Sequence, residues 1–312
     1  MHNPDAATPA AQALDVLVVG EALTDIVTSH EGTTEHPGGS PANVAYGLGR
    51  LGVNTGLLTA FGNDDRGAAI EKHILSARVS LLPGSRSLRR TSTATAALAP
   101  DGSASYDFDI AWDIQPPVPT VVPKIIHTGS IATFLAPGAN SVKSLLQQCR
   151  PDCTVTYDPN IRPALLGSHA EAVSIFEDLV HLTNIVKLSD EDAKWLYPDH
   201  DLDRTATHIL QLGADLAVIT QGSSGSLLAT RATRMSIPAV ESKVVDTIGA
   251  GDSYMSALIL GLLTRGTDGL APAVLEQLGR TAAMAAAITV RRAGANPPTA
   301  DELRTQLQKQ RV

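Results

Sequence analysis

Short apolar runs alternate along the chain with longer segments whose apolar residues recur every three to four positions. The short runs are rich in Val, Ile and Leu, and they predict buried strands at 14–20, 55–61, 124–128, 154–157, 184–188 and 216–220. The longer segments predict helices at 41–51, 67–77, 138–149, 169–182, 190–196, 202–212, 253–263 and 271–290. Strands that alternate with helices form parallel sheets covered by helices on both faces. The pattern therefore predicts a three-layer α/β/α fold with a mainly parallel central sheet.

The segment 91–110 breaks this alternation. It is rich in Thr, Ser and Ala, alternates apolar with polar residues, and contains Pro100-Asp101-Gly102, which predicts a β-hairpin with a turn at these three residues. A hairpin inserted into an alternating β and α chain indicates a lid. We expect a disordered tail over 1–12 and one domain over 13–312, with a β lid formed by about 26–37 and 88–115.

The composition excludes several classes of partner. The chain has 312 residues, of which 43% are hydrophobic, and a net charge of −8. Its 24 Lys and Arg residues are scattered, whereas binding to a nucleic-acid backbone needs a basic field. No apolar stretch has the length of a membrane span, and the N-terminus lacks the pattern of a secretion signal. We expect a cytoplasmic enzyme with no nucleic-acid or membrane partner, in which Cys149 and Cys153 are free thiols.

The segment 246–254 reads Asp-Thr-Ile-Gly-Ala-Gly-Asp-Ser-Tyr and leads into an apolar helical stretch. Its small residues let backbone N–H groups approach a phosphate, and the helix dipole adds positive potential at the same point. A carboxylate beside a phosphate is repulsive, so Asp252 there suggests a base that takes a proton from an attacking hydroxyl. The alternative is an ordinary capped helix start. The first interpretation predicts phosphoryl transfer.

Polar residues also follow four of the predicted strands, where ligands of parallel sheets bind. These residues are Asp25, the segment Asp158 to Arg162, the segment Ser189 to Asp192, and the segment Thr220 to Gly225. Each has a structural alternative: a turn carboxylate, a proline-defined turn with a local Asp–Arg pair, a helix N-cap and a hairpin turn, respectively.

Two common nucleotide-binding motifs are excluded. Gly47 to Gly52 fits G-x-G-x-x-G, but it ends a predicted helix and precedes a strand, the reverse of a dinucleotide-binding fold. We therefore expect Gly47 to Gly52 to terminate a helix. The chain also contains no G-x-x-x-x-G-K-[ST] loop.

Two distant motifs together resemble those of the ribokinase-like (PfkB) family of carbohydrate kinases. The stretch from Gly38 to Ala45, Gly-Gly-Ser-Pro-Ala-Asn-Val-Ala, resembles the family's N-terminal glycine-glycine motif. Asp246 to Asp252 resembles its C-terminal D-T-x-G-A-G-D motif at every fixed position, and Thr220-x-Gly222-x-x-Gly225 is also in place. The resemblance covers the chain from Leu14 to about Pro298. It implies a ribokinase-like fold with a small β lid and ATP-dependent phosphorylation of a sugar hydroxyl.

The resemblance also implies roles for individual residues. The general base would be Asp252, and the anion hole would be formed by the amides of Gly249, Ala250 and Gly251. The sugar contacts would be Asp25, Gly38, Gly39, Asn43 and Arg162, beside Asp252 itself. The nucleotide contacts would be Ser189, Thr220, Gly222, Ser223, Gly225, Thr247, Gly249 and Gly251. Tyr106 or Phe108 would be an apolar wall over the sugar or, alternatively, a packing residue of the lid.

The metal-binding motif departs from the family pattern. Many relatives have N-x-x-E where this chain has Ser189-Asp190-Glu191-Asp192, which puts Ser189 at the Asn and the shorter Asp192 at the Glu. A kinase needs Mg²⁺ to bridge the phosphates, and this ion keeps much of its water. We expect water-mediated Mg²⁺ binding by Asp192 or by Glu191. The resemblance leaves open a K⁺ site made of backbone carbonyls near 246–252.

The motifs resemble the fructokinase branch most, with 2-keto-3-deoxygluconate as the rival substrate and ribose and nucleosides as further alternatives. A sugar acid needs a cation to pair with its carboxylate. Residues 91–115 contain no Lys or Arg but four Asp residues, which favours a neutral sugar, although Arg162 is available to a carboxylate. An alternative from another class is a regulator that binds sugar or nucleotide without turnover. An exposed β lid also predicts a homodimer joined through the lids.

Overall fold

The computed structural model describes residues 14–29, 32–98, 104–115, 122–265 and 270–310. Its main sheet has nine strands in the order β13-β12-β11-β10-β9-β8-β1-β4-β5. Every neighbouring pair from β5 to β11 is parallel, while β11, β12 and β13 pair antiparallel at one edge. The strands are β1 (Val16–Val19), β4 (Thr55–Leu58), β5 (Ser80–Leu81), β8 (Ile125–Gly129), β9 (Thr154–Asp158), β10 (Ile185–Ser189), β11 (Leu216–Thr220), β12 (Ser226–Ala229) and β13 (Arg234–Ile237). The predicted mainly parallel sheet is confirmed.

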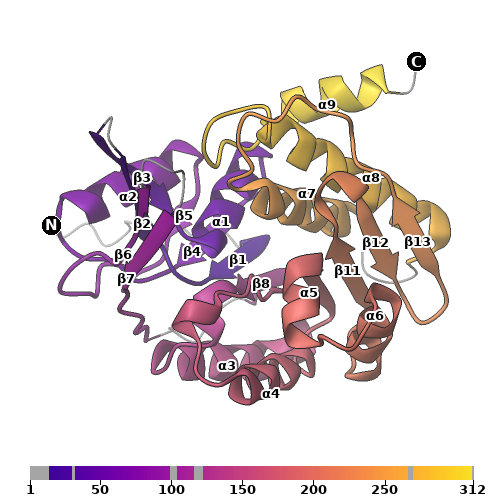
Figure 1. The fold of residues 1–312 in the computed structure, drawn as a ribbon, viewed down its shortest axis with the longest axis horizontal. Coiled ribbons are helices and arrows are strands. Elements are labelled where there is room, and N and C mark those ends of the chain that lie inside the picture. Colours follow the sequence, from indigo (N-terminus) through magenta and orange to yellow (C-terminus); the bar gives the residue numbers. More distant parts are fainter. Residues whose placement is uncertain (1–13, 30–31, 99–103, 116–121, 266–269, 311–312) are drawn as a thin grey trace, which may run out of the picture.

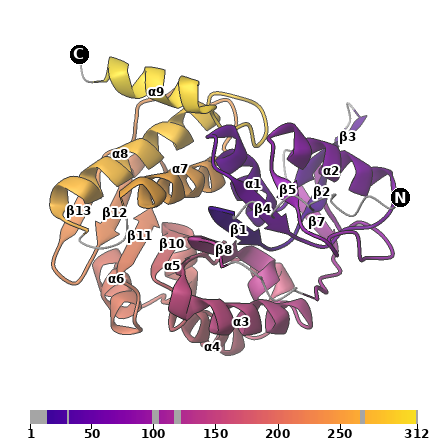
Figure 2. The ribbon, with the colours of Figure 1, turned by 180° about the vertical axis from the view of Figure 1, so that it is seen from behind.

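Helices cover both faces of this sheet (Figures 1 and 2). They are α1 (Ser40–Arg50), α2 (Asp65–Ser76), α3 (Gly138–Cys149), α4 (His169–Val180), α5 (Asp190–Leu196), α6 (Leu202–Gln211), α7 (Ala250–Arg265), α8 (Pro272–Thr289) and α9 (Ala300–Lys309). Short 3₁₀ turns lie at Ser130–Thr133, Arg150–Asp152, Pro163–Leu165 and Gly222–Ser224. Within the described residues, no helix has both the length and the apolar character that a membrane crossing requires.

The alternation of side chains along each strand divides the core into two parts. In β1, Val16 and Val18 pack in the cluster that includes α1, α2, α7, α8 and α9. Leu17 and Val19 point to the other face and pack with α3, α4, α5 and α6. Because successive residues of a strand face opposite sides, continuous apolar strands are what a sheet with two covered faces requires. The three-layer architecture follows from this pattern.

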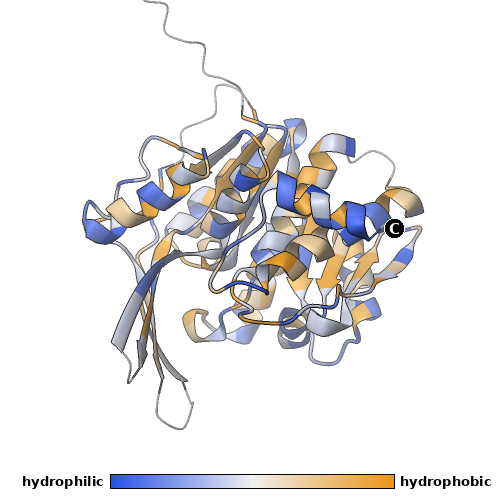
Figure 3. Cartoon of the chain, turned by 90° about the horizontal axis from the view of Figure 1, so that it is seen from above, coloured by the Kyte–Doolittle hydropathy of each residue, from blue (hydrophilic) through white to orange (hydrophobic). Residues whose placement is uncertain are grey.

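A second sheet of four strands projects from the main body (Figure 3). Its order is β3-β2-β6-β7, with bounds β2 (Leu23–Ser29), β3 (Gly32–Gly38), β6 (Thr93–Leu98) and β7 (Ala104–Asp109). The antiparallel pair β6–β7 is the predicted hairpin. Its predicted turn at 100–102, the expected tail over 1–12 and the side chain of Tyr106 lie outside the described residues.

The predicted helix end near Gly52 is confirmed. Helix α1 ends at Arg50, and Gly52 follows with φ +82°, a left-handed conformation that favours glycine. Gly47 lies inside α1, where a Cβ would lie 2.4 Å from Oγ of Ser256 in α7. The absence of a side chain at Gly47 therefore lets α1 and α7 approach closely.

Candidate active site

The glycine turn predicted to bind an anion leads directly into helix α7. Gly249 has φ +74°, and a Cβ there would lie 2.7 Å from Cβ of Ala295, so both conformation and space require glycine. The helix begins at Ala250, and the amides of a first helical turn have no acceptors within their own helix. The amides near Gly251 and the helix dipole therefore form a site that attracts anions.

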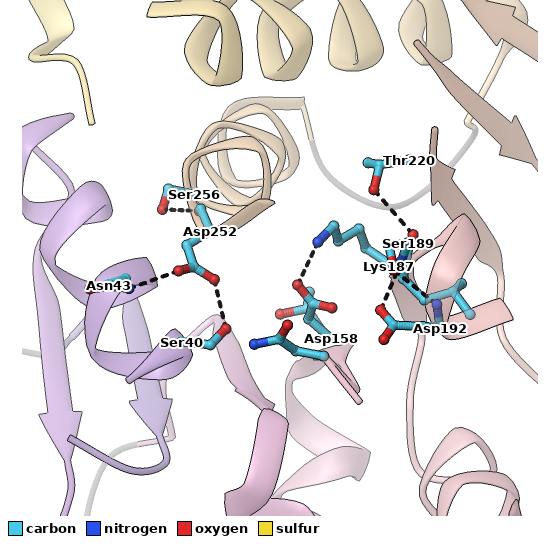
Figure 4. Close-up of polar contacts among 12 residues, drawn as sticks. Ser40, Asn43, Asp158, Lys187, Ser189, Asp192, Thr220, Asp252 and Ser256 are labelled. Atoms are coloured by element: carbon cyan, nitrogen blue, oxygen red, sulfur yellow. Dashed lines mark hydrogen bonds and ion pairs between the residues drawn. The ribbon is translucent and has the colours of Figure 1, made fainter. Parts of the chain in front are cut away.

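Asp252, in the first turn of α7, is held by two residues of α1 (Figure 4). Ser40 donates from Oγ to Oδ1 of Asp252 at 2.6 Å, and Asn43 donates from Nδ2 to Oδ2 at 2.9 Å. Burial raises the pKa of Asp252, while these two hydrogen bonds and the charges of Lys187 and Arg162 oppose the rise. The result is a fixed carboxylate with a pKa above its ordinary value, which suits a general base.

The hydroxyl group of Ser256 forms a hydrogen bond between α7 and α1. Ser256 Oγ donates to the backbone carbonyl of Val44 at 3.1 Å and to that of Asp252 at 2.8 Å. Because Gly47 removes the side chain that would block this approach, the two helices bring Asp252 to Ser40 and Asn43.

Asp25 lies within β2, rather than in the turn that follows the first strand, because β1 ends at Val19 and the chain is extended again from Leu23. A Cβ on Gly38 would lie 2.0 Å from Oδ2 of Asp25, and one on Gly39 would lie 2.6 Å from the carbonyl oxygen of Glu21. Glycine at position 38 therefore leaves room for the Asp25 carboxylate, and glycine at position 39, with φ +99°, lets the chain pass close to the backbone of Glu21. Burial, followed by the charge of Asp252, raises the pKa of Asp25 to about 6.

Arg162 adds a positive charge to this group of carboxylates. Its Nη1 donates to the carbonyls of Asn160 and Ile161 at 3.3 and 3.0 Å, which fixes the guanidinium beside its own loop. Its charge lowers the pKa of Asp25 and opposes the rise at Asp252. The structure thus places Arg162 within the electrostatic environment of both acids.

Glu21, which follows β1, is a second buried acid near this group. Burial raises its pKa to about 8, although it accepts a hydrogen bond from the backbone N–H of Ala132 at 3.2 Å. Glu21 is therefore mostly protonated at neutral pH, and it adds little negative charge to the site.

Ser189 and Asp192 form a reciprocal cap on α5. Asp192 accepts the N–H of Ser189 at Oδ2 and the N–H of Ile161 at Oδ1, at 3.0 and 2.8 Å. The helix N-cap, which was the structural alternative for this motif, is therefore present. Each oxygen still has a lone pair for water, and the neighbouring Glu191 is exposed. Among the described residues, no group of three or more His, Cys, Asp or Glu side chains is placed to ligate a metal directly.

The predicted nucleotide contacts come from two segments: the ends of β10 and β11 with the turn that follows β11, and the loop before α7. Thr220 ends β11 and pairs in register with Ser189 of β10, and Gly222 and Gly225 have φ +52° and +96°. A Cβ on Gly225 would lie 2.0 Å from the carbonyl oxygen of Ile237, so this turn needs glycine. Ser223 in the turn and Thr247 before α7 are both exposed.

Asp246 holds the loop before α7, which contains Thr247, against the chain that follows α8. Its Oδ1 accepts the N–H of Ile248 at 3.0 Å, and its Oδ2 accepts the N–H of Gly294 at 2.8 Å. This first residue of the D-T-x-G-A-G-D motif therefore holds the loop that precedes the anion-binding turn.

Two buried charges at the site had been given no role from the sequence, although Asp158 begins the segment Asp158 to Arg162 that was expected at the ligand-binding edge of the sheet. Lys187 of β10 and Asp158 of β9 form an ion pair with an Nζ–Oδ2 distance of 2.7 Å, and their side chains are 5% and 2% exposed (Figure 4). The sequence signal is a lysine inside an otherwise apolar strand, Ile-Val-Lys-Leu. A buried charge at the carboxyl end of a parallel strand often belongs to a functional site.

The arrangement as a whole has three chemical capacities. Asp252 can take a proton, the start of α7 can stabilise an anionic group, and Asp25 can accept hydrogen bonds from hydroxyls. Bringing these groups together fits the transfer of an anionic group to an alcohol.

Comparisons with known proteins agree with this chemistry. The family profile described as "pfkB family carbohydrate kinase" matches residues 13–302. A fructokinase of Rhizobium leguminosarum bv. trifolii is 29% identical over 259 residues, which are 79% of each chain.

Solved structures show the same fold. The aminoimidazole riboside kinase of Salmonella enterica superposes with a TM-score of 0.80 at 24% identity, over 94% of this chain and 99% of that one. A double mutant of the fructokinase of Vibrio cholerae O395 superposes with a TM-score of 0.79 at 23% identity, over 94% of this chain and 99% of that one. That structure is described with bound fructose, ADP and potassium ion.

Proposed function

The chain belongs to the pfkB family of carbohydrate kinases, and from this premise we propose that the sugar it phosphorylates with ATP is fructose. The observation that supports the proposal most is the fixed carboxylate of Asp252, which Ser40 and Asn43 hold at the anion-attracting start of α7. A family member that had lost turnover would have no need to keep this base.

In the proposed reaction, Asp252 takes the proton of the sugar hydroxyl as its oxygen attacks the γ-phosphorus of ATP. The bond from this phosphorus to the bridging oxygen breaks, and ADP leaves with the electron pair. The amides of Gly249, Ala250 and Gly251 stabilise the charge on the transferred group. Asp25 and Asn43 orient the sugar through its other hydroxyls, and Gly38 and Gly39 give the sugar access to the backbone.

The electrostatics of the site favour a neutral acceptor. Arg162 is the cation that a sugar acid would need, but its charge is already offset by Asp25 and Asp252. In the second sheet, β7 carries Asp107 and Asp109, of which Asp109 is paired with Arg90, and none of the predicted lid residues 91–115 is a Lys or Arg that could bind a carboxylate. These observations support fructose over 2-keto-3-deoxygluconate, while ribose and ribosides remain the neutral alternatives.

The fructose preference is also supported by relatives. The Rhizobium protein is named a fructokinase, and the Vibrio fructokinase is described with bound fructose. The Salmonella kinase acts on a riboside, which makes ribosides the second class of acceptor to test.

We further propose that ATP lies along Ser189, Thr220, Gly222, Ser223, Gly225 and Thr247, with its phosphates at Gly249 and Gly251. Water on Glu191 and Asp192 would hold Mg²⁺, which neutralises phosphate charge when bound. A K⁺ ion, described with the Vibrio fructokinase, would bind to backbone carbonyls of the loop that Asp246 fastens.

The location and assembly of the protein are part of the same proposal. We propose a cytoplasmic enzyme, since ATP is its phosphoryl donor. The outer strands β3 and β7 leave two edges on the second sheet, and we propose that a second copy covers this sheet in a dimer. Light scattering coupled to size exclusion tests this, and a mass of one chain would contradict it.

The acceptor is tested by measuring ADP formation with Mg²⁺-ATP and one acceptor at a time: fructose, ribose, 2-keto-3-deoxygluconate and aminoimidazole riboside. We expect the highest kcat/KM for fructose. A higher value for the acid would contradict the neutral-sugar argument and assign Arg162 to a carboxylate. Binding of these sugars without any turnover would favour the non-catalytic regulator.

A further inference from the structure

Lys187 carries a charge inside a strand that is otherwise apolar. Its neighbours in β10, Ile185, Val186 and Leu188, are fully buried, and its own side chain is 5% exposed. Moving an ammonium group out of water is costly, so a buried lysine needs a partner. Asp158 at the end of β9 provides a carboxylate at 2.7 Å.

This ion pair leaves hydrogen-bonding capacity unused on both sides. An ammonium has three N–H donors. Within the described part of the chain, Asp158 Oδ2 is the acceptor that Lys187 Nζ reaches. Asp158 Oδ1 is also buried without a hydrogen-bond partner among those residues. Buried pairs that serve stability alone are expected to have their remaining donors and acceptors satisfied.

The free donors of Lys187 lie at the anion site. A Cβ on Gly251 would lie 3.0 Å from Nζ of Lys187, which puts the ammonium against the first turn of α7. In Figure 4 this ammonium lies between Asp252 on one side and Ser189 and Thr220 on the other. It is thus placed between the base and the expected nucleotide contacts.

The surrounding charges keep the lysine protonated. Burial alone lowers the pKa of Lys187, but the charges of Asp158, Asp252 and Asp192 more than offset it, so the pKa is raised. A protonated lysine here is a fixed positive charge that a bound anion meets without any rearrangement of the chain.

We propose that Lys187 is a catalytic residue of the phosphoryl transfer, whose ammonium donates to the γ-phosphoryl group, and that Asp158 is the residue that positions it. The inference rests on the proposed reaction but not on which sugar is the acceptor. Lys187 keeps its proton throughout, because Asp252 takes the proton of the acceptor. The new oxygen–phosphorus bond forms while the bond to the bridging oxygen of ADP breaks.

The expected effect follows from the charge that develops on the transferred group. This charge is spread over three equatorial oxygens, and donors fixed around it stabilise the transition state. Removal of one fixed donor of this kind costs about 10²–10³-fold in kcat. We expect the same range for loss of the Lys187 ammonium.

The test uses the full chain with Lys187→Met, the double variant Lys187→Met with Asp158→Asn, and Lys194→Met. The single variant leaves Asp158 buried without its counter-ion, which destabilises the fold. The double variant removes both charges, so it is expected to melt close to the wild type. Lys194 is an exposed lysine of α5 and is the matched control. Turnover is measured at a temperature where thermal melts show every variant folded.

We expect the double variant to lose about 10²–10³-fold in kcat, and Lys194→Met to keep the wild-type value. A double variant within threefold of wild-type kcat would overturn the proposal and make Lys187 only the counter-ion of Asp158. If the wild type turns over none of the four sugars, the proposed acceptor fails, and calorimetric titration of ATP and ADP decides the role of Lys187. In that case a selective loss of ATP affinity supports it, and an unchanged ratio of the two affinities overturns it.

Discussion

Ser40 donates a 2.6 Å hydrogen bond to the Asp252 carboxylate across 212 positions of sequence. This contact joins the two motifs of the chain, because Ser40 begins α1 and Asp252 lies in the first turn of α7. One motif therefore holds the base that the other motif carries.

Ser40→Ala is expected to lower kcat on the acid side of its pH profile. The hydrogen bond from Ser40 lowers the pKa of Asp252, so its loss raises that pKa and leaves less ionised base. A hydrogen bond to a charged group contributes about 1.5–3 kcal/mol. The acid limb of the kcat–pH profile should move to higher pH. Ser76→Ala, on the exposed face of α2, is the control, and an unmoved limb in Ser40→Ala would argue against this role of Ser40.

Sugar binding is expected to weaken as the pH falls below about 6. Burial and the charge of Asp252 raise the pKa of Asp25 to about 6, and only the ionised carboxylate accepts from hydroxyls at both oxygens. Asp252→Asn removes one cause of the rise, so the midpoint for fructose binding should move to lower pH. Calorimetric titration from pH 4.5 to 8 measures both midpoints. Identical midpoints would mean that the two carboxylates are not coupled.

Glu21→Gln is expected to stabilise the protein more at pH 8 than at pH 5. The pKa of Glu21 rises from 4.5 to about 8 on folding, so between these values the folded state binds more protons than the unfolded chain. The free energy of unfolding therefore falls as the pH rises through this window, and the glutamine variant lacks this loss. A pKa that differs by one between the folded and unfolded chain corresponds to about 1.4 kcal/mol, so the difference in unfolding free energy should reach a few kcal/mol.

Thermal melts at pH 5, 6.5 and 8 measure the difference between Glu21→Gln and the wild type. Glu276→Gln, at an exposed position of α8, is the control that should show little change. A constant difference across the three pH values would show that Glu21 does not change its proton occupancy on folding.

The central sheet was predictable because its strands are buried on both faces. A continuous apolar run such as Leu216 to Thr220 indicates a buried strand without any information from the rest of the chain, and the helices between the strands have a regular apolar period. Helix α9 was missed because it is mainly polar and only Leu303 is buried. Its local signal is the capping box of Thr299 and Glu302, which a search for start motifs would find.

The candidate site was predictable only where a motif contains several of its residues. Asp252 and Asn43 lie in two such motifs, and the structure joins them by a 2.9 Å hydrogen bond. The pair of Lys187 and Asp158 depends on β9 lying beside β10, which no local pattern specifies. The placement of Asp25 in a second sheet likewise depends on pairing between β2 and β6, which are far apart in sequence.

The most direct test of the account is the kcat of fructose phosphorylation in Asp252→Asn, measured beside the wild type and Asp199→Asn, an exposed control. General base catalysis contributes about 10²–10⁴-fold, so we predict a loss of at least about 10²-fold in Asp252→Asn. Calorimetry should show that this variant still binds ATP, and Asp199→Asn should match the wild type. A kcat within tenfold of wild type in Asp252→Asn would contradict the assignment of Asp252 as the base.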